Sequence, residues 1–328
     1  MKRDSSVETY RCLLMFAICW LHCCLQGGRL EETRGIYYVM RPAVVGFVYI
    51  SGWFGINCSI LKCCRLIFIG VICALISIEL NCLVSGGMMR VVDVLYACMK
   101  GYWFLWAYLA LMMVSPLLNA ALGGDESEVN KRIWPLLALV FGWAFLTHIP
   151  FIKCYVPTTA GVTALSFVTM AGVYVVARII RQRRYDRYFA SAWFWCVFVV
   201  SSVLCWLGFS HYDSVFALIV AVGVFQIVRK LQLPDIGSRI VLAISPSMFA
   251  VYLLHQTIHG FNFVEFGMKT GMTVFDDSSK CCTFVAAVVV FAGCVFLDLL
   301  RRLCVAMFTK LFNVCYSVCR RNNDIDSL

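Results

Sequence analysis

Long apolar runs separated by short polar loops constrain this chain more than any other feature. Hydrophobic residues fill 62% of its 328 positions and charged residues only 14%, whereas a soluble domain carries about 25% charged residues. Runs of about 18 to 25 apolar residues can cross a hydrocarbon core of about 30 Å as helices. None of them alternates polar and apolar residues as a membrane strand does. The sequence therefore predicts an all-α, polytopic integral membrane helical bundle.

Ten transmembrane helices are expected. We place them at residues 10–27, 39–61, 65–85, 98–122, 134–152, 159–180, 189–209, 213–232, 240–260 and 281–308. An even number puts both termini on one side. With both termini cytoplasmic, twenty of the 28 Lys and Arg residues lie on the inner side, as the positive-inside rule requires. No long hydrophilic segment interrupts the spans, so residues 1–328 are predicted to form a single transmembrane domain. The basic residues then serve orientation at the membrane lipids, and nucleic acid is not an expected partner.

Arg11 and His22 are the most informative polar residues of the first span. Eleven helical positions are about three turns and rise about 16 Å, so the two side chains share one face. Ionisable groups inside a membrane usually face a bundle interior and mark a functional site. The alternative is that Arg11 reaches the cytoplasmic interface and that His22 is a hydrogen-bonded packing residue.

Two features of the second span and its exit are candidates for a site. The small pair Ser51-Gly52 would let a ligand or another backbone approach closely, although such residues serve helix packing more often. Lys62 and Arg65 are three positions apart and so share a helix face. They would hold the phosphates of an anionic cosubstrate, or simply anchor the helix end.

The later spans contain several polar or helix-disturbing residues. Pro116 is expected to kink or end the fourth span. His255 and His259 are four positions apart, which would place both on one helix face, but HQTIH lacks the glutamate of HExxH and a third ligand. The 19 cysteines include no CxxC pair, so no metal site is expected. We assign no role to the other polar residues at depth, which are Glu79, Asn81, His148 and Asp298.

Several segments, taken in order, resemble acyltransferase family 3, a family of integral membrane proteins. They are SSVETYRCLLMFAICWLH, FVYISGWF, KCCR, YWFLWAYLALMMVSPLLN, GVTALSFVTMAGVYVVARIIR and SMFAVYLLH. The resemblance covers nearly the whole chain. It implies a ten-helix O-acyltransferase of the bacterial inner (plasma) membrane. The donor would be a cytoplasmic acyl-CoA, commonly acetyl-CoA, and the acceptor a hydroxyl group of an envelope glycan or lipid-linked sugar.

The resemblance also implies roles for individual residues. The family's essential pair corresponds to Arg11 and His22, its basic loop motif to Lys62 and Arg65, and its recurrent positions to Trp103, Phe104 and His255. Ser51 and Trp103 are expected, with His255, to line the substrate cavity. One departure concerns an aspartate that many members carry six residues before the serine of the SG pair. That position is Val45 here, so a mechanism in which this aspartate orients the histidine does not carry over.

The residues are compatible with this chemistry on physical grounds. A neutral histidine takes a proton from a sugar hydroxyl near neutral pH, and burial beside an arginine keeps His22 neutral. Arg11 would bind a CoA phosphate or stabilise charge on the thioester oxygen. His22 would act either as the base or as a transient acyl carrier.

Two other classes of protein stay open at the sequence level. A glycan or solute transporter would use Arg11, His22 and Glu79 as a charge or proton pathway, and dependence on acyl-CoA separates it from an enzyme. A metal permease would use His255, His259 and the cysteines, and would bind or move a metal ion.

Overall fold

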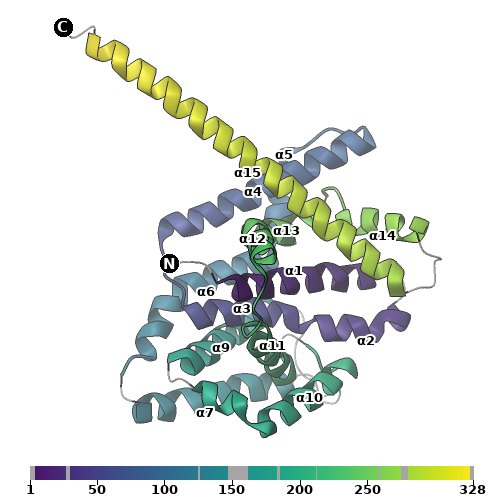
Figure 1. The fold of residues 1–328 in the computed structure, drawn as a ribbon, viewed down its shortest axis with the longest axis vertical. Coiled ribbons are helices and arrows are strands. Elements are labelled where there is room, and N and C mark those ends of the chain that lie inside the picture. Colours follow the sequence, from purple (N-terminus) through teal and green to yellow (C-terminus); the bar gives the residue numbers. More distant parts are fainter. Residues whose placement is uncertain are drawn as a thin grey trace.

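The computed structural model describes residues 4–26, 30–124, 126–146, 162–182, 185–211, 213–257, 259–274 and 280–325. Within these ranges every regular element is a helix (Figure 1). In chain order the elements are α1 (Ser5–Gln26), α2 (Leu30–Met40), α3 (Pro42–Phe54), α4 (Ile60–Ser85), α5 (Val91–Tyr96), η1 (Ala97–Gly101), α6 (Trp103–Ala121), α7 (Glu126–Leu146), α9 (Val162–Gln182), η2 (Tyr185–Ala190), α10 (Ala192–Trp206), α11 (Val215–Val228), α12 (Asp235–Ile244), η3 (Ser245–Ser247), α13 (Met248–Leu254), α14 (Phe263–Val274) and α15 (Lys280–Ile325). The all-α prediction is confirmed for this part of the chain.

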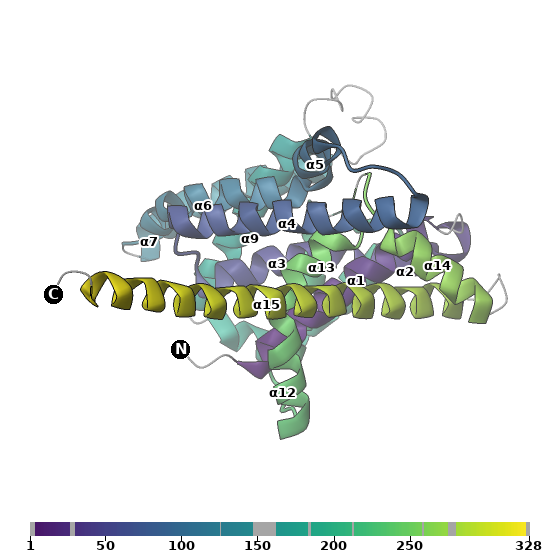
Figure 2. The same ribbon diagram turned by 90° about the horizontal axis from the view of Figure 1, so that it is seen from above.

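Helix α1 lies in the interior and is fixed on two sides (Figures 1 and 2). The Tyr10 hydroxyl donates to the backbone oxygen of Ala221 in α11 at 2.7 Å. The Tyr10 ring also meets Phe225 edge-on, with centroids 5.4 Å apart. On a different face of α1, the Trp20 indole donates to the Thr283 hydroxyl of α15 at 3.1 Å. Another part of the α1 surface is directed at α3 and α13.

The backbones of α3 and α9 approach each other closely at Gly52. A Cβ atom at Gly52 would lie 2.5 Å from the backbone oxygen of Tyr174 and 2.7 Å from Cβ of Ala177. Membrane helices gain little from the hydrophobic effect and associate through such close packing of small residues. Gly52 therefore holds α3 against α9, which confirms the packing alternative for this half of the Ser51-Gly52 pair.

Five helices in the described ranges are long and apolar enough to cross a membrane. They are Ser5–Gln26, Ile60–Ser85, Trp103–Ala121, Asp235–Leu254 and Lys280–Lys310. Two shorter apolar helices, Ala192–Trp206 and Val215–Val228, lie within two more of the predicted spans. The predicted spans at 134–152 and 159–180 extend into residues 147–161, which lie outside the described part. The count of ten and the side of the termini stay predictions.

The second span is not the continuous helix predicted over residues 39–61. Helix α3 ends at Phe54, and Gly55 follows with φ +78°, a left-handed conformation that favours glycine. Helix α4 then begins after Ser59, whose side chain caps it by accepting from the Lys62 amide. The sequence signal for this break is a glycine followed four residues later by a capping serine, and the apolar composition of the run obscured it.

The predicted end of the ninth span needs correction, and so does the alternative that Pro116 ends the fourth span. Helix α13 ends at Leu254, and His259 has φ +60° in the following segment, so the shared helix face for His255 and His259 was wrong. Pro116 lies inside α6, which continues to Ala121. Proline cannot donate to the backbone oxygen of Met112, and the Ser115 hydroxyl donates to that oxygen instead, at 2.8 Å. The last helix runs to Ile325 and extends past the other helices (Figure 2).

Candidate functional site

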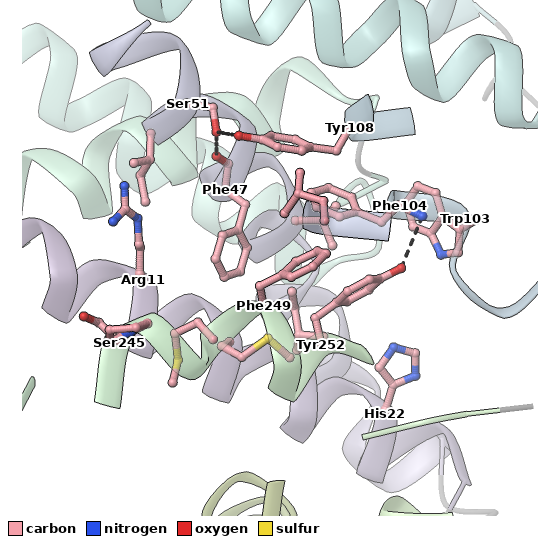
Figure 3. Close-up of a pocket in the computed structure, with 17 residues that line it drawn as sticks. Arg11, His22, Phe47, Ser51, Trp103, Phe104, Tyr108, Ser245, Phe249 and Tyr252 are labelled. Carbon is pink, nitrogen blue, oxygen red and sulfur yellow. Dashed lines mark hydrogen bonds between the residues drawn. The ribbon is translucent and has the colours of Figure 1, made fainter. Parts of the chain in front are cut away.

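A cavity of about 300 Å³ lies between α1, α3, α6 and the η3–α13 segment. Arg11 and His22 line it from α1, Ser51 from α3, Trp103 from α6 and Tyr252 from α13. Figure 3 shows Arg11 and His22 at opposite ends of this space. The expectation that both side chains share one interior face is confirmed. Ser51 and Trp103, which were also expected to line the cavity, do line it.

Arg11 is held by a carboxylate on its own helix. Its Nη1 donates to Oε1 of Glu8 at 2.6 Å. The Glu8 side chain is only 7% exposed, whereas that of Arg11 is 35% exposed. A buried carboxylate needs a charged or hydrogen-bonding partner, and the three-residue spacing lets Glu8 reach one turn along α1. Sequence reasoning missed Glu8, although its spacing from Arg11 was a readable signal.

His22 lies against a second histidine from a distant part of the chain. The His22 and His255 ring centroids are 4.9 Å apart, with the planes inclined by 55°. His255 is only 3% exposed and follows directly after α13. His255 contacts the His22 ring but does not itself line the cavity, contrary to the prediction.

The hydrogen bonds of His255 define which of its nitrogens carries a proton. Nδ1 of His255 lies 2.7 Å from the backbone oxygen of Tyr252 and 3.2 Å from that of Val251. A carbonyl oxygen only accepts, so Nδ1 is the donor. In a neutral ring Nε2 is then the acceptor. This Nε2 is buried and has no hydrogen-bond partner among the described residues.

Ser51 and Tyr108 form a hydroxyl pair in the wall of the cavity (Figure 3). The Ser51 hydroxyl donates to the backbone oxygen of Phe47 at 3.0 Å. Its oxygen lies 3.2 Å from the Tyr108 hydroxyl, which therefore donates to it. Ser51 thus belongs to the cavity, and its neighbour Gly52 packs against α9. Tyr108 was not singled out from the sequence, although it lies within the YWFLWAY segment.

Aromatic side chains form the wall nearest to His22. Trp103 and Phe104 meet edge-on with centroids 5.8 Å apart, and Phe104 stacks on Tyr108 at 6.1 Å. The Tyr252 hydroxyl accepts from the Phe104 amide at 3.2 Å, which ties α13 to the first turn of α6. The result is a largely apolar space with a few polar groups, which is typical of a small-molecule site.

Lys62 and Arg65 do not line the cavity. Both are exposed on the first turns of α4, and Leu66, one residue further, does line it. Lys62 Nζ donates to the backbone oxygen of Asn57 at 2.9 Å. The pair therefore lies beside a cavity-lining residue, and the structure does not bring it into the space between Arg11 and His22.

Three of the remaining polar residues, Glu79, Asn81 and Asp298, do not line this cavity. Asp298 is fully buried and pairs with Arg301 at 2.6 Å. Asn81 donates to the backbone oxygen of His259 at 3.5 Å, and Glu79 is exposed. His148 lies outside the described residues. Across the ranges that the structure describes, no group of three or more His, Cys, Asp or Glu residues could hold a metal ion.

Apolar helices of membrane-spanning length around a cavity with a few polar groups define an integral, multi-pass membrane protein. The acyltransferase domain of family 3 matches residues 4–301, and this chain belongs to that family of membrane acyltransferases. No curated protein and no solved structure matches the chain. Family membership favours the acyltransferase over the transporter and the metal permease.

Proposed function

We propose that this chain is an O-acyltransferase that transfers acetyl from cytoplasmic acetyl-CoA to a hydroxyl of a cell-envelope glycan or lipid-linked sugar. The supporting observation is that Arg11 and His22, the family's essential pair by resemblance, line one cavity from a single helix. We place the enzyme in the inner (plasma) membrane of a bacterium, as a ten-helix protein with both termini cytoplasmic.

His22 acts as the general base in this proposal. Its ring takes the proton of the acceptor hydroxyl while the hydroxyl oxygen attacks the thioester carbonyl carbon. The carbon–sulfur bond then breaks, and the departing CoA sulfur receives the proton from His22. If His22 first carries the acetyl group itself, the same cavity serves both half-reactions.

Arg11 holds the donor rather than the reacting carbonyl. Eleven residues along α1 separate it from His22 by about 16 Å, too far for both side chains to contact one carbonyl group. Its guanidinium, fixed by Glu8 at 2.6 Å, is suited to a CoA phosphate. The thioester then extends along the cavity toward His22. Lys62 and Arg65, on the first turns of α4, add positive charge for the same donor.

His255 takes over the orienting role that an aspartate has in many family members. Val45 occupies that position and is 3% exposed in the apolar core, so it supplies no acceptor. The buried Nε2 of His255, against the His22 ring, is an available acceptor for an N–H of His22. A hydrogen bond there would leave the other His22 nitrogen free for the acceptor hydroxyl.

The proposal is tested by transfer of labelled acetyl from acetyl-CoA to glycan in membranes that contain the chain. His22→Ala should reduce transfer by about 10²- to 10⁴-fold, the usual contribution of a general base. Leu13→Ala is the matched control, because Leu13 lies on the same helix and is 47% exposed. Protein levels are equalised by immunoblot. Wild-type transfer that His22→Ala leaves unchanged would contradict the assigned base.

A further inference from the structure

Three arginines surround the C-terminal end of α3. The guanidinium carbon of Arg181 lies 5.1 Å from the centroid of the Trp53 ring, and that of Arg229 lies 5.0 Å from it. Arg178 lies against Gly55, where a Cβ atom would be 2.9 Å from its Nη1 and 3.0 Å from its Cζ. Only a residue without a side chain leaves room for this guanidinium. We name Arg178, Arg181 and Arg229 the α3-end cluster.

One donor of the Arg178 guanidinium makes no hydrogen bond among the described residues. Its Nε is buried and has no hydrogen-bond partner within the described residues, and the side chain is half-buried. A guanidinium offers five donors, and because the side chain is only half-buried, part of the guanidinium is open to an acceptor from outside. An anion with several acceptor oxygens, such as a phosphate, fits this fork best.

Side-chain hydrogen bonds hold the turn that lies against Arg178. The Ile56 amide donates to the Tyr174 hydroxyl at 3.0 Å, and that hydroxyl donates to Oδ1 of Asn119 at 2.9 Å. Nδ2 of Asn119 lies 3.4 Å from the Ile56 backbone oxygen, to which it donates. These bonds connect α3, α6 and α9 around the residues that follow Gly55. Arg178 therefore extends from helix α9 over a hydrogen-bonded turn.

The cluster lies at the Arg11 end of the cavity. Gly55 is one turn beyond Ser51, which lines the cavity. Lys62, one turn before the cavity residue Leu66, binds the same turn through the Asn57 oxygen at 2.9 Å. On the α1 side, the Ser6 hydroxyl donates to the backbone oxygen of Leu231 at 2.7 Å, two residues after Arg229. These contacts bring the start of α1 and the cluster to one end of the bundle.

We propose that Arg178, supported by Arg181, binds a phosphate group of the acyl-CoA donor outside the cavity mouth. This inference rests on the proposed function, because it places the nucleotide part of the donor whose thioester reaches His22. It adds a ligand from α9 to the basic pair of α4, which the sequence had suggested. An anionic lipid headgroup offers the same phosphate chemistry, so the test distinguishes the two sources.

The experiment measures CoA binding rather than turnover, using the purified full chain in nanodiscs of neutral lipid. Arg178→Met keeps the apolar stem of the side chain and removes the guanidinium. Arg239→Met is the matched control, since Arg239 is an exposed arginine of α12. We expect Arg178→Met to bind CoA about 10- to 100-fold more weakly, as for loss of a charge-assisted hydrogen bond. The control should bind as wild type does. Pantetheine, which has no phosphate, should bind all three proteins alike.

Each other outcome identifies what has failed. Equal CoA affinity of wild type and Arg178→Met would overturn the phosphate site while leaving the acyltransferase intact. Absence of CoA binding by wild type would overturn the proposed function as well. A defect of Arg178→Met that persists with pantetheine would show a structural role. A difference in thermal stability between wild type and Arg178→Met that appears only after phosphatidylglycerol is added, with equal CoA affinity, would assign the cluster to a lipid headgroup.

Discussion

Substitution of Gly52 by alanine tests whether the α3–α9 contact holds the site together. The new Cβ would lie 2.5 Å from the Tyr174 backbone oxygen, whereas ordinary contact begins at 3.4 Å. Helix α9 would therefore have to shift by roughly 0.9 Å. Overpacking of this kind costs about 1–3 kcal/mol. We expect the upper half of that range, because the Tyr174 oxygen and Cα are backbone atoms that cannot rotate away.

Two neighbouring variants separate packing from chemistry. Ser51→Ala adds no atoms and removes a hydroxyl that bonds Phe47 and Tyr108, so it should cost about 1 kcal/mol or less. Gly142→Ala is the packing control, because a Cβ at this helical position of α7 meets nothing within 4 Å. Alanine also favours a helix over glycine.

The assay is thermal unfolding of the purified chain, followed by tryptophan fluorescence in one detergent, together with acetyl transfer. Gly52→Ala should melt several degrees below wild type and lose activity in proportion to its unfolded fraction. Ser51→Ala should melt close to wild type and show reduced transfer. Gly142→Ala should melt at or slightly above wild type, because alanine favours the helix, and should transfer acetyl as wild type does. A melting temperature of Gly52→Ala equal to that of Gly142→Ala would refute the close backbone contact.

The remaining predictions concern the ends of the cavity. Glu8→Gln should raise the KM for acetyl-CoA several-fold with a smaller change in kcat, because Arg11 loses the carboxylate that orients it; an unchanged KM would mean that the ion pair does not position the donor. Lys62→Ala combined with Arg65→Ala should raise that KM by about 2- to 5-fold, since both side chains are exposed, and no change would return the pair to membrane anchoring. His255→Ala should lower kcat by about tenfold at constant KM, and His255→Gln, whose amide also accepts, should restore part of it. Equal rates for these two variants would argue against the orienting hydrogen bond.

Local geometry explains which parts of the site were predictable. Arg11 and His22 belong to one helix, so their common face follows from the helical repeat alone. The apolar runs likewise indicated membrane-spanning helices, and five such helices are present in the described part of the chain. The break at Gly55 was less visible, because apolar composition does not distinguish a continued helix from a helix, a turn and a second helix.

Contacts between distant segments could not be read from the sequence. Nothing in the residues near His22 indicates that His255, 233 positions later, lies 4.9 Å from it. The same applies to the Ser51–Tyr108 hydroxyl pair and to Arg178 over Gly55. Composition and helical periodicity by themselves determined the helical membrane class and the one-face placement of Arg11 and His22. Only tertiary packing decided which side chains meet them, because that depends on how separate helices cross.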